Sequence, residues 1–590
     1  MPVIWSIIIV SLMPFYTLKI IVTLILSRLI NSKIMILCIL IGFIVMIPLN
    51  QSGTVKGKVI QINDYSTIIS HRFQNFKIMT SYSGSLDDIV FVSGELTTKE
   101  LSVSDRSKRI VGKIEKVEEF RLSRKGKTIR SFLWNRFKDD SFLRAILFNE
   151  YLEDFPLMSS LSMQLGGLLS MVAYALRYRV ERKDIRSIQL VMIAVYGLIF
   201  GISFGVLRLF ISRLKLSREK QMVLLQCIYP NTVLYLGFIY PYAHDLIKGF
   251  SARLKEVPRY VVYPILMSLT THRINFIEMF FYRIYRIVCA LLFVLVLLSL
   301  LLPLGPFVYS FASLYQTTMT SFTRFIVLGK INLIFVPIFL VLTYRRKIQY
   351  GLISILIGFV LMVYPLHTRV SFLNVGQGDA TLIQMPFNAY TILIDTAHPN
   401  AQSKLLKSLN RYGVNRIDEL ILTHDDLDHV GNVDAIKDRT QNIIDQKHQD
   451  VPFLVKYLDG VEYEDPNANS LIFGFNTKRT SFLFMGDAGI DQERVLMKDH
   501  PFLKADVLKL GHHGSKTSTS EDFLSSIQPS YGIVSAHPRT YGHPHVEVMN
   551  SLYRFRVKPL LTYDSGNIRF VSGFLFDYVL TDAFGFGIIR

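Results

Sequence analysis

Long apolar runs, separated by short polar breaks, dominate the first two thirds of the chain. A helix that crosses the hydrocarbon core of a bilayer needs about 20 consecutive apolar residues. The pattern therefore predicts a polytopic α-helical membrane protein with about eight to ten crossings. A membrane hairpin would occupy residues 1–50, and residues 121–366 would hold a basic amphipathic stretch followed by a multi-span core. The apolar runs of that core lie at about 157–176, 187–207, 222–243, 260–270 with 275–302, 305–343 and 349–366.

The pattern changes between residues 51 and 120, where short β-rich segments alternate with Asn, Asp, Ser and Gly turns. These segments read VKGKVIQI, STIIS, FKIMT, IVFVSGEL and RIVGKIEKV. Five strands of this length predict a small OB-like all-β domain. OB-type barrels often bind single-stranded nucleic acid through aromatic side chains. Because few aromatic residues are available here, a nucleic-acid-binding role and a spacer or docking role both stay open.

The last 224 residues, 367–590, have the alternating strands and helices of one soluble α/β unit. Strand after strand in this unit ends on a residue that can bind a metal ion, whereas chance would scatter such residues over surface helices. The sequence therefore predicts a metal site along one rim of a β-sandwich or α/β sheet. The strand-end candidates are Asp395, His424, Asp487 and His512, with a further histidine-rich turn at His543 and His545.

The segment LILTHDDLDHVGN, residues 420–432, concentrates this chemistry in one turn. An apolar strand leads into His424, Asp426, Asp428 and His429, four potential donors within six residues. Such a loop at the end of a strand can direct several side chains toward one point. A solvated acidic turn with two incidental histidines is the alternative for this segment taken alone.

Composition and charge indicate where in the cell the protein is located and what kind of partner it binds. Hydrophobic residues make up 50% of the chain and charged residues 19%, and the net charge is +19. These values favour a membrane protein with a polyanionic partner, although basic cytoplasmic loops account for part of the excess. The basic turn at residues 344–347 is typical of a cytoplasmic loop. It predicts that the C-terminal unit is extracytoplasmic, on the same side as the β-domain. The three cysteines, which lie in apolar runs, predict neither disulfides nor a thiolate metal site.

Several motifs of the C-terminal unit carry a family resemblance. HDDLDH, followed by MGDAG and LGHHGS, resembles the metallo-β-lactamase superfamily, whose members are αββα sandwiches that bind two metal ions on one edge. The larger set resembles the ComEC family of DNA-internalisation competence proteins. That set reads FLNVGQGDATLI, THDDLDHVG, MGDAG, DVLKLGHHGSKTSTS and YGHPH, behind apolar runs and an OB-like domain.

The resemblance implies roles for individual residues. The superfamily pattern HxHxDH falls on His424, Asp426, Asp428 and His429, with Asp426 in place of the second histidine. Asp487 matches the aspartate that bridges two metal ions, and His512 or His513 matches the final histidine ligand. His448, the one histidine between Val430 and Gly486, is expected in a surface loop.

Other residues receive supporting roles. Asp395 would accept a hydrogen bond from a ligand imidazole, and Asp379 would be a further ligand or a similar support. Asp428 is expected to take part in catalysis as well as in metal binding. His543 and His545 are candidates for proton donation to the leaving oxygen or for phosphate contact, with a purely structural role as the alternative. Because a first site of His424, Asp426 and Asp487 would be rich in oxygen ligands, the resemblance and the donor set together predict two divalent metal ions, with Mn preferred over Zn.

The implied function is an inner-membrane channel for uptake of single-stranded DNA in natural transformation, with an extracytoplasmic two-metal nuclease domain. The implied enzyme is a metal-dependent phosphodiesterase (DNase), and the implied location is the bacterial cytoplasmic membrane. Expected partners are single-stranded DNA, membrane lipid, an extracellular DNA receptor and a cytoplasmic helicase-type ATPase, because the chain has no P-loop of its own. The alternative is a membrane-anchored metal-dependent hydrolase of envelope polymers. The sequence does not set the oligomeric state.

Overall fold

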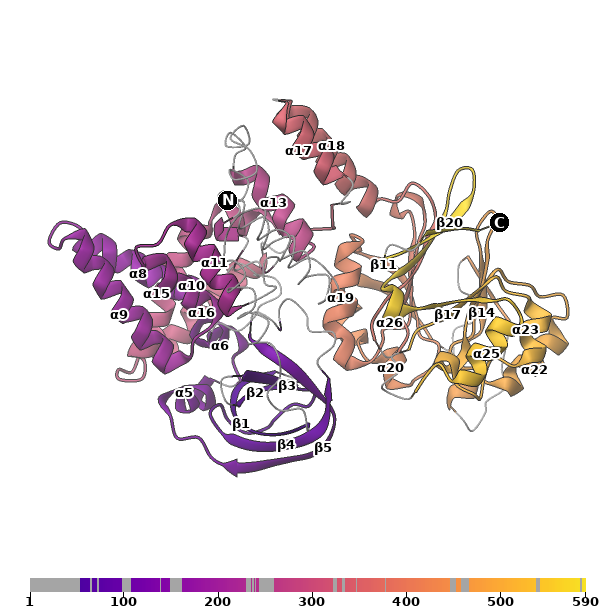
Figure 1. Cartoon of the computed structure of the whole chain (residues 1–590), viewed down its shortest axis with the longest axis horizontal. Helices are drawn as coiled ribbons and strands as arrows, with labels where there is room; N and C mark the ends of the chain where they lie inside the picture. Colours follow the sequence, from indigo (N-terminus) through magenta and orange to yellow (C-terminus); the bar gives the residue numbers. More distant parts are fainter. Residues whose placement is uncertain are drawn as a thin grey trace, which may run out of the picture. The chain divides into compact units, whose positions relative to one another are not determined.

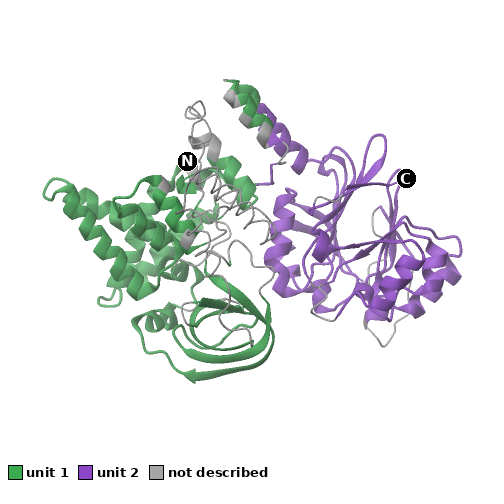
Figure 2. Ribbon diagram, viewed as in Figure 1, with its two compact units in different colours: residues 1–327, 338–352 green, residues 328–337, 353–590 purple. Residues whose placement is uncertain are grey.

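The computed structural model divides the chain into two compact units (Figure 2). One contains residues 1–327 and 338–352, and the other contains residues 328–337 and 353–590. The predicted hairpin over residues 1–50 and His448 lie outside the residues that the structure describes. The structure describes residues 53–589 except 64–65, 72–73, 98–104, 106–107, 138, 149–161, 230–234, 236–237, 239, 243–258, 322–325, 332–334, 346, 377, 446–452, 458–465, 537–541 and 584–585.

Five strands of the first unit form a closed barrel in the order β1-β2-β3-β5-β4, the architecture predicted for this region (Figure 1). Alternate side chains point inward, where Val59, Phe76 and Ile114 are fully buried. The last strand runs past the predicted limit of the domain at residue 120. The strands are β1 Thr54–Asn63, β2 Ser66–His71, β3 Gln74–Ile78, β4 Ile89–Thr97 and β5 Ile110–Arg124.

A helical region follows the barrel in the same unit. Its apolar core includes Leu143, Leu169 and Leu292, and helices α8 and α15 pack against each other. A short two-stranded sheet joins β6 Arg273–Asn275 to β7 Ile326–Leu328. The helices of this unit are α5 Ile129–Phe137, α6 Ser141–Phe148, α8 Met163–Leu176, α9 Arg182–Phe200, α10 Phe204–Arg213, α11 Arg218–Ile228, α13 Arg259–Thr270, α14 Phe276–Phe280, α15 Tyr282–Leu298 and α16 Gly305–Ser321. Two further helices, α17 Phe335–Tyr344 and α18 Ile348–Val363, have residues in both units.

The prediction of a polytopic α-helical membrane fold is wrong for this part of the chain. Among the described residues, none of the helices combines the length and the apolar character needed to cross a bilayer. The run at 187–207 shows why, because a turn at Gly201–Ser203 divides it between α9 and α10. Helix α9 reaches 19 residues but begins with Arg182, Lys183 and Asp184. The apolar content of the sequence was therefore a poor guide to helix length.

Two sheets form the centre of the second unit. The eight-stranded sheet has the order β12-β11-β10-β9-β8-β19-β20-β21, and the six-stranded sheet has the order β13-β14-β15-β16-β17-β18. Phe372 of one sheet and Phe484 of the other contact each other in the core between them, with ring centroids 6.0 Å apart. The strands are β8 Arg369–Phe372, β9 Thr381–Gln384, β10 Thr391–Ile394, β11 Ile417–Ile421, β12 Thr440–Ile444, β13 Leu454–Lys456, β14 Phe473–Asn476, β15 Ser481–Phe484, β16 Val507–Lys509, β17 Tyr531–Val534, β18 Lys558–Leu561, β19 Ile568–Ser572, β20 Asp577–Thr581 and β21 Phe586–Ile589.

Helices cover the outer faces of both sheets, which gives four layers in the order αββα (Figure 1). Helix α19 buries Leu405 and Leu409 against the eight-stranded sheet. On the other sheet, α22, α23 and α25 bury residues such as Leu496, Leu524 and Leu552. Parallel pairing of β10 with β11 and of β15 with β16 brings the carboxyl ends of these strands to common edges. The helices are α19 Gln402–Arg411, α20 Leu427–Val430, α21 Val433–Ile436, α22 Ile490–Asp499, α23 Glu521–Ile527, α25 Val546–Arg554 and α26 Thr562–Ser565.

Candidate metal centre

Loops that follow the strands of both sheets converge on one buried cluster. His424 and His429 follow β11, Asp487 follows β15, and His513 follows β16. All four side chains are at most 3% exposed as residues. The cluster therefore combines ionisable groups from both sheets in a place where water cannot screen their charges.

Two glycines allow these loops to approach each other. Gly486, directly before Asp487, has φ +54°, and a Cβ there would lie 2.8 Å from the Ser470 Cβ. Gly378 has φ +98°, and a Cβ there would lie 2.3 Å from the Asp428 carbonyl oxygen. The same Asp428 carbonyl oxygen accepts a hydrogen bond from the Asp379 N–H at 3.1 Å. Any larger residue at these two positions would push the loops apart.

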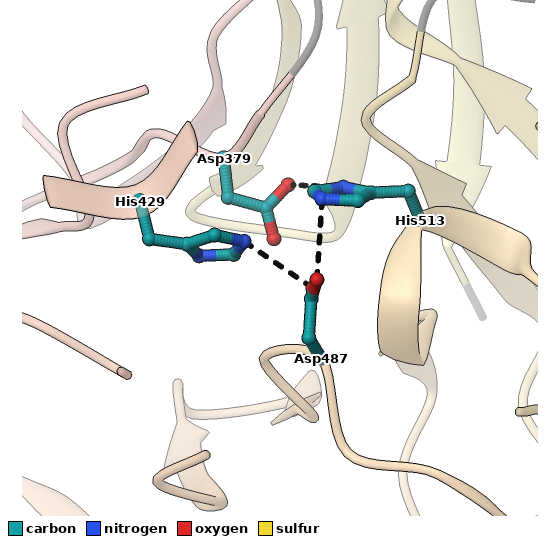
Figure 3. Close-up of side chains that lie close together, drawn as sticks. All are labelled: Asp379, His429, Asp487 and His513. Carbon is teal, nitrogen blue, oxygen red and sulfur yellow. Dashed lines mark ion pairs between the residues drawn. The ribbon is translucent and has the colours of Figure 1, made fainter. Parts of the chain in front are cut away.

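Asp487 lies at the centre of the cluster (Figure 3). Its Oδ1 is 3.3 Å from His429 Nε2, and its Oδ2 is 3.4 Å from His513 Nε2. Asp428 Oδ2 lies 3.2 Å from the same His513 nitrogen. One potential ligand atom from each of four residues lies within 4.8 Å of all the others: Asp379, His429, Asp487 and His513.

His424 and Asp426 extend the cluster on one side. His424 Nε2 lies 4.0 Å from Asp487 Oδ2 and 3.7 Å from Asp426 Oδ2. The Asp426 side chain is 45% exposed, whereas that of His424 is fully buried. Asp487 therefore lies near imidazoles of both predicted ligand sets, and its bridging role stays a prediction.

The outer nitrogen of each imidazole has its own partner. His429 Nδ1 lies 2.7 Å from Asp395 Oδ2, and Asp395 also accepts the Thr423 N–H at 2.8 Å. His424 Nδ1 lies 3.1 Å from Thr423 Oγ1 and 3.3 Å from Ser470 Oγ. Partners of this kind fix the tautomer and the ring orientation of a metal-binding histidine. They leave both Nε2 atoms directed toward Asp487.

Asp379 supports the third imidazole. Its Oδ1 lies 3.4 Å from His513 Nδ1, and its Oδ2 pairs with Lys509 Nζ at 2.7 Å. The Lys509 side chain is only 3% exposed. The geometry therefore allows Asp379 either to orient His513 or to act as a ligand itself.

Charges inside the cluster shift each pKa. Burial opposes the charged form of His513, but the Asp487 and Asp379 carboxylates outweigh it and raise its pKa to about 10. Burial also opposes the charged form of His429, but the Asp395 and Asp487 carboxylates raise its pKa well above its usual value. Burial and the neighbouring His429 lower the pKa of His424. Burial would raise the pKa of Asp487, but His513 and His429 hold it well below its usual range.

The donor set fits a divalent metal ion. Several buried ligand atoms have no hydrogen-bond partner among the described residues: His424 Nε2, His429 Nε2, His513 Nε2, Asp379 Oδ1 and Asp487 Oδ1. Leaving such groups unsatisfied costs about 1–3 kcal/mol each, and more for charged groups. A cation would satisfy those of these atoms that bind it, and its binding would release the protons that His429 and His513 hold without it.

The structure separates the two histidines of LGHHGS. Both have left-handed backbones, with φ 42° for His512 and 54° for His513, yet only His513 joins the cluster. The His512 ring lies 5.8 Å from the ring of His543, which lies 5.0 Å from the ring of His545. The three form a second group, here termed the histidine trio, next to the cluster.

Within the histidine trio, His543 differs from His429 and His513 of the cluster in the direction of its pKa shift. Burial, with His513 and His545 close by, lowers the pKa of His543 to about 4, so this ring is neutral at pH 7. His545 Nδ1 accepts the Lys516 N–H at 2.9 Å, which assigns the ring proton of neutral His545 to Nε2. His545 is thus a hydrogen-bond donor and His543 a proton acceptor.

Sequence reasoning missed three supporting residues: Thr423, Ser470 and Lys509. A lysine between Leu508 and Leu510 in a short buried strand is a signal for a buried ion pair. Ser470 lies far from the motifs in sequence, and it supports the centre by accepting the Asp487 N–H at 3.0 Å through its Oγ. Thr423 and Lys509 lie inside quoted motifs but are not metal-ligand types, and Ser470 lies outside every quoted motif.

Comparison with known proteins relates the chain to two groups. The model of the metallo-beta-lactamase superfamily matches residues 373–457. ComE operon protein 3 of Bacillus subtilis (strain 168) is 28% identical over 274 residues, which cover 37% of this chain and 35% of that protein. Recombination protein 2 of Haemophilus influenzae is 32% identical over 228 residues, which cover 34% of this chain and 28% of that protein. Competence protein ComA of Neisseria gonorrhoeae is 29% identical over 231 residues, with 35% and 32% covered.

Two solved structures are similar at lower identity. The metallo-beta-lactamase fold protein YhfI from Bacillus subtilis is 10% identical with a TM-score of 0.25, and the match covers 33% of this chain and 96% of that one. A diphosphatase from the PhnP family is 13% identical with a TM-score of 0.24, and 34% and 98% are covered. The match to the curated relatives spans about a third of their length. The resemblance to competence proteins is confirmed: the chain is similar to three proteins of the ComEC family, and residues 373–457 of its C-terminal unit match the metallo-beta-lactamase superfamily.

Proposed function

We propose that the C-terminal unit is a metal-dependent phosphodiesterase that cleaves DNA during its uptake. The observation that carries this proposal is the set of buried nitrogen and oxygen atoms without hydrogen-bond partners around Asp487. A hydrolase domain that binds metal ions explains why these particular imidazole and carboxylate atoms gather at one site. The hydrolase domain itself is compatible with several phosphate esters. The similarity to competence proteins is what favours DNA as the polymer.

The proposed ligands form two sets that share Asp487. His424 and Asp426 would complete one set, and Asp428, His429 and His513 the other. When bound, divalent ions would supply positive charge that activates water and stabilises the phosphate oxygens. Once Asp379 is included, the proposed ligands contain more carboxylates than imidazoles. This composition favours Mn or Mg over Zn.

The chain's own residues would orient the substrate and move protons. His545 carries its proton on Nε2 and can donate a hydrogen bond to a phosphate or leaving oxygen. His543 is neutral and suits proton acceptance, so the predicted role as a proton donor falls to His545 in this proposal. Asp395 and Asp379 would hold the ligand imidazoles in place through their hydrogen-bonded contacts.

The roles of a DNA channel and of an extracytoplasmic location stay predictions from the family resemblance. The same holds for single-stranded DNA, membrane lipid, the DNA receptor and the helicase-type ATPase as partners. The alternative substrate, an envelope polymer, also stays open as an outcome of the test below.

The test uses the complete chain, depleted of metal and then supplied with Mn, Mg or Zn. Cleavage of single- and double-stranded DNA is measured beside cleavage of a polyol-phosphate envelope polymer. Asp428→Ala and Asp487→Ala are the test variants, and Asp499→Ala, an exposed carboxylate on α22, is the matched control. The proposal expects Mn-dependent DNA cleavage that the test variants lose and the control keeps. Cleavage of the envelope polymer alone would assign the site to the alternative, and no cleavage by the metal-loaded chain would refute the proposal.

A further inference from the structure

A second cluster of charge lies around Tyr412, away from the metal centre. Three guanidinium groups surround its ring, with the Cζ atoms of Arg369, Arg411 and Arg569 at 5.2, 5.8 and 5.8 Å from the ring centroid. The Tyr412 side chain is fully buried. We term this group the Tyr412 cluster, and it also includes Lys330 and Asp582.

The backbone brings these residues together from separate elements. Arg369 lies on β8 and Arg569 on β19, and the two strands pair with Arg569 opposite Ser371. Both arginines therefore lie on the same face of the sheet. Arg411 is the last residue of α19, which covers that face, and its carbonyl oxygen accepts the Lys330 N–H at 3.1 Å.

Positive charge in the Tyr412 cluster exceeds negative charge. Asp582 accepts two hydrogen bonds from Arg411, at 2.6 and 2.8 Å, and lies 3.9 Å from Arg569 Nη2. Four cations, Lys330 and the three arginines, thus face one carboxylate among the described residues, which leaves a net charge of +3 (four minus one). The tyrosine ring stabilises nearby cations only in part, by about 0.5–2 kcal/mol each.

Several donors in this cluster have no acceptor. The Nε atoms of Arg369, Arg411 and Arg569 are buried and make no hydrogen bond within the described part of the chain. Arg369 is only 5% exposed, and its Nη2 donates a hydrogen bond to the Met362 carbonyl oxygen at 3.2 Å. Burial, with neighbouring arginines, lowers the pKa of Arg369 to about 10 and that of Lys330 to about 8. Each of these features shows a charge that lacks compensation.

The cluster is open to solvent on one side. The side chains of Arg411, Arg569 and Asp582 are 18%, 16% and 24% exposed. An anion can therefore reach the guanidinium groups without unfolding the unit. Guanidinium groups match phosphate oxygens in geometry and charge, and several together are a typical phosphate site.

We propose that the Tyr412 cluster binds a phosphate group, and that the phosphate belongs to the headgroup of an anionic lipid. The lipid source rests on the neighbouring surface. Met362, whose carbonyl oxygen accepts from Arg369, lies at the end of α18, where Leu356, Tyr364 and Leu366 are 60%, 47% and 52% exposed. Apolar side chains beside a basic pocket suit an acyl chain beside a phosphate.

This inference is independent of the proposed hydrolysis, because the Tyr412 cluster shares no residue with the metal centre. Its first test is the unfolding temperature of the complete chain in inorganic phosphate and in chloride at equal ionic strength. Phosphate should raise the unfolding temperature by several degrees more than chloride does. The extra rise should disappear in Arg569→Gln, persist in part in Arg569→Lys, and persist fully in Arg494→Gln, an exposed arginine on α22.

The second test identifies the source of the phosphate. Flotation with vesicles of phosphatidylcholine alone and of phosphatidylcholine with phosphatidylglycerol should show binding to the anionic vesicles, weaker by about fivefold in Arg569→Gln. Lys330→Gln gives a second variant if the arginine change impairs folding. Stabilisation by phosphate without vesicle binding would reject the lipid and retain a free phosphate ligand. Equal effects of phosphate and chloride on the original chain, or an unchanged response in both variants, would refute the site.

Discussion

The barrel and the metal centre both bury carboxylates, but Asp88 of the barrel and Asp487 of the metal centre differ in their hydrogen bonds. Asp88 of the barrel accepts hydrogen bonds from Tyr82 Oη at 2.8 Å, Ser85 N at 2.9 Å and Gly126 N at 2.7 Å. Asp487 of the metal centre is equally buried, yet its Oδ1 has no hydrogen-bond partner among the described residues. Burial of charge alone therefore does not mark a functional site. A buried charge that the fold leaves uncompensated does mark a candidate functional site.

The basic residues show the same contrast. Lys77 and Lys113 of the barrel both lie near Asp105, at 3.6 and 3.9 Å. In the Tyr412 cluster, Asp582 alone faces Lys330 and the arginines among the described residues. For the C-terminal unit we have proposed that one cluster binds a cation and that the other binds an anion.

The largest effect is expected for Asp487→Asn. The neutral amide keeps the shape of the side chain but removes the charge shared by both sets of proposed ligands. Hydrolysis of DNA in Mn should fall by more than about 100-fold, since even supporting residues around metal ligands are worth 10–100-fold. The measurement is the initial cleavage rate under metal saturation. An activity within a factor of two of the original chain would remove Asp487 from the centre.

Asp395→Asn should have a smaller effect on the same site. Asp395 contacts no proposed metal-binding atom and acts through the Nδ1 of His429. Affinity for Mn should fall by about 10–100-fold, and the cleavage rate should recover at high Mn concentration. Titration of the rate with Mn separates this outcome from loss of a ligand. A rate that stays low at every Mn concentration would show that Asp395 does more than orient the imidazole.

Asp88→Ala tests the other side of the comparison. Loss of its carboxylate leaves three donors without their acceptor and should destabilise the barrel by about 1–3 kcal/mol. Hydrogen exchange of the barrel amides measures this change locally. Mn binding and DNA cleavage should not change. A loss of Mn affinity in this variant would contradict the separation of structural from functional carboxylates.

The smallest effect concerns Lys330 and pH. Burial, with Arg411 as the next cause, lowers its pKa from 10.5 to about 8, so the unfolded chain binds more protons than the folded chain between these values. Stability should therefore rise as pH increases from about 8 to 10.5, with the full penalty below pH 8. Lys330→Gln should remove this rise, which is visible as the difference between the unfolding curves of the two chains. Parallel curves at all pH values would show that Lys330 is not held in an uncompensated site.

The sequence predicted the metal centre better than it predicted the architecture around it. Ligands at strand ends follow from chain direction, so the contributions of β11, β15 and β16 could be foreseen. The choice between His512 and His513 could not, because both adopt left-handed backbones and the direction of each ring depends on tertiary contacts. Lys509 was missed because a lysine is not a metal-ligand type, and its ion pair with Asp379 depends on tertiary contacts.

For the helical region, the prediction from the sequence was wrong. Apolar runs predicted membrane-spanning helices, but hydrophobicity does not reveal where a helix ends. The turn at Gly201–Ser203 and the charged start of α9 limit helix length in ways that a sum over apolar residues ignores. The barrel strands, in contrast, were predicted well because Asn, Asp and Gly turns separate them. Local breaks in the pattern were thus more informative than its average.

The most direct test of the central claim is a count of bound metal. The complete chain, Asp487→Asn and Asp88→Asn are dialysed to equilibrium against limiting Mn, and the metal retained per chain is measured. We expect the original chain and Asp88→Asn to retain the same amount of Mn, and Asp487→Asn to retain little or none. Equal retention by all three folded chains, or none by any of them, would contradict a metal centre at Asp487.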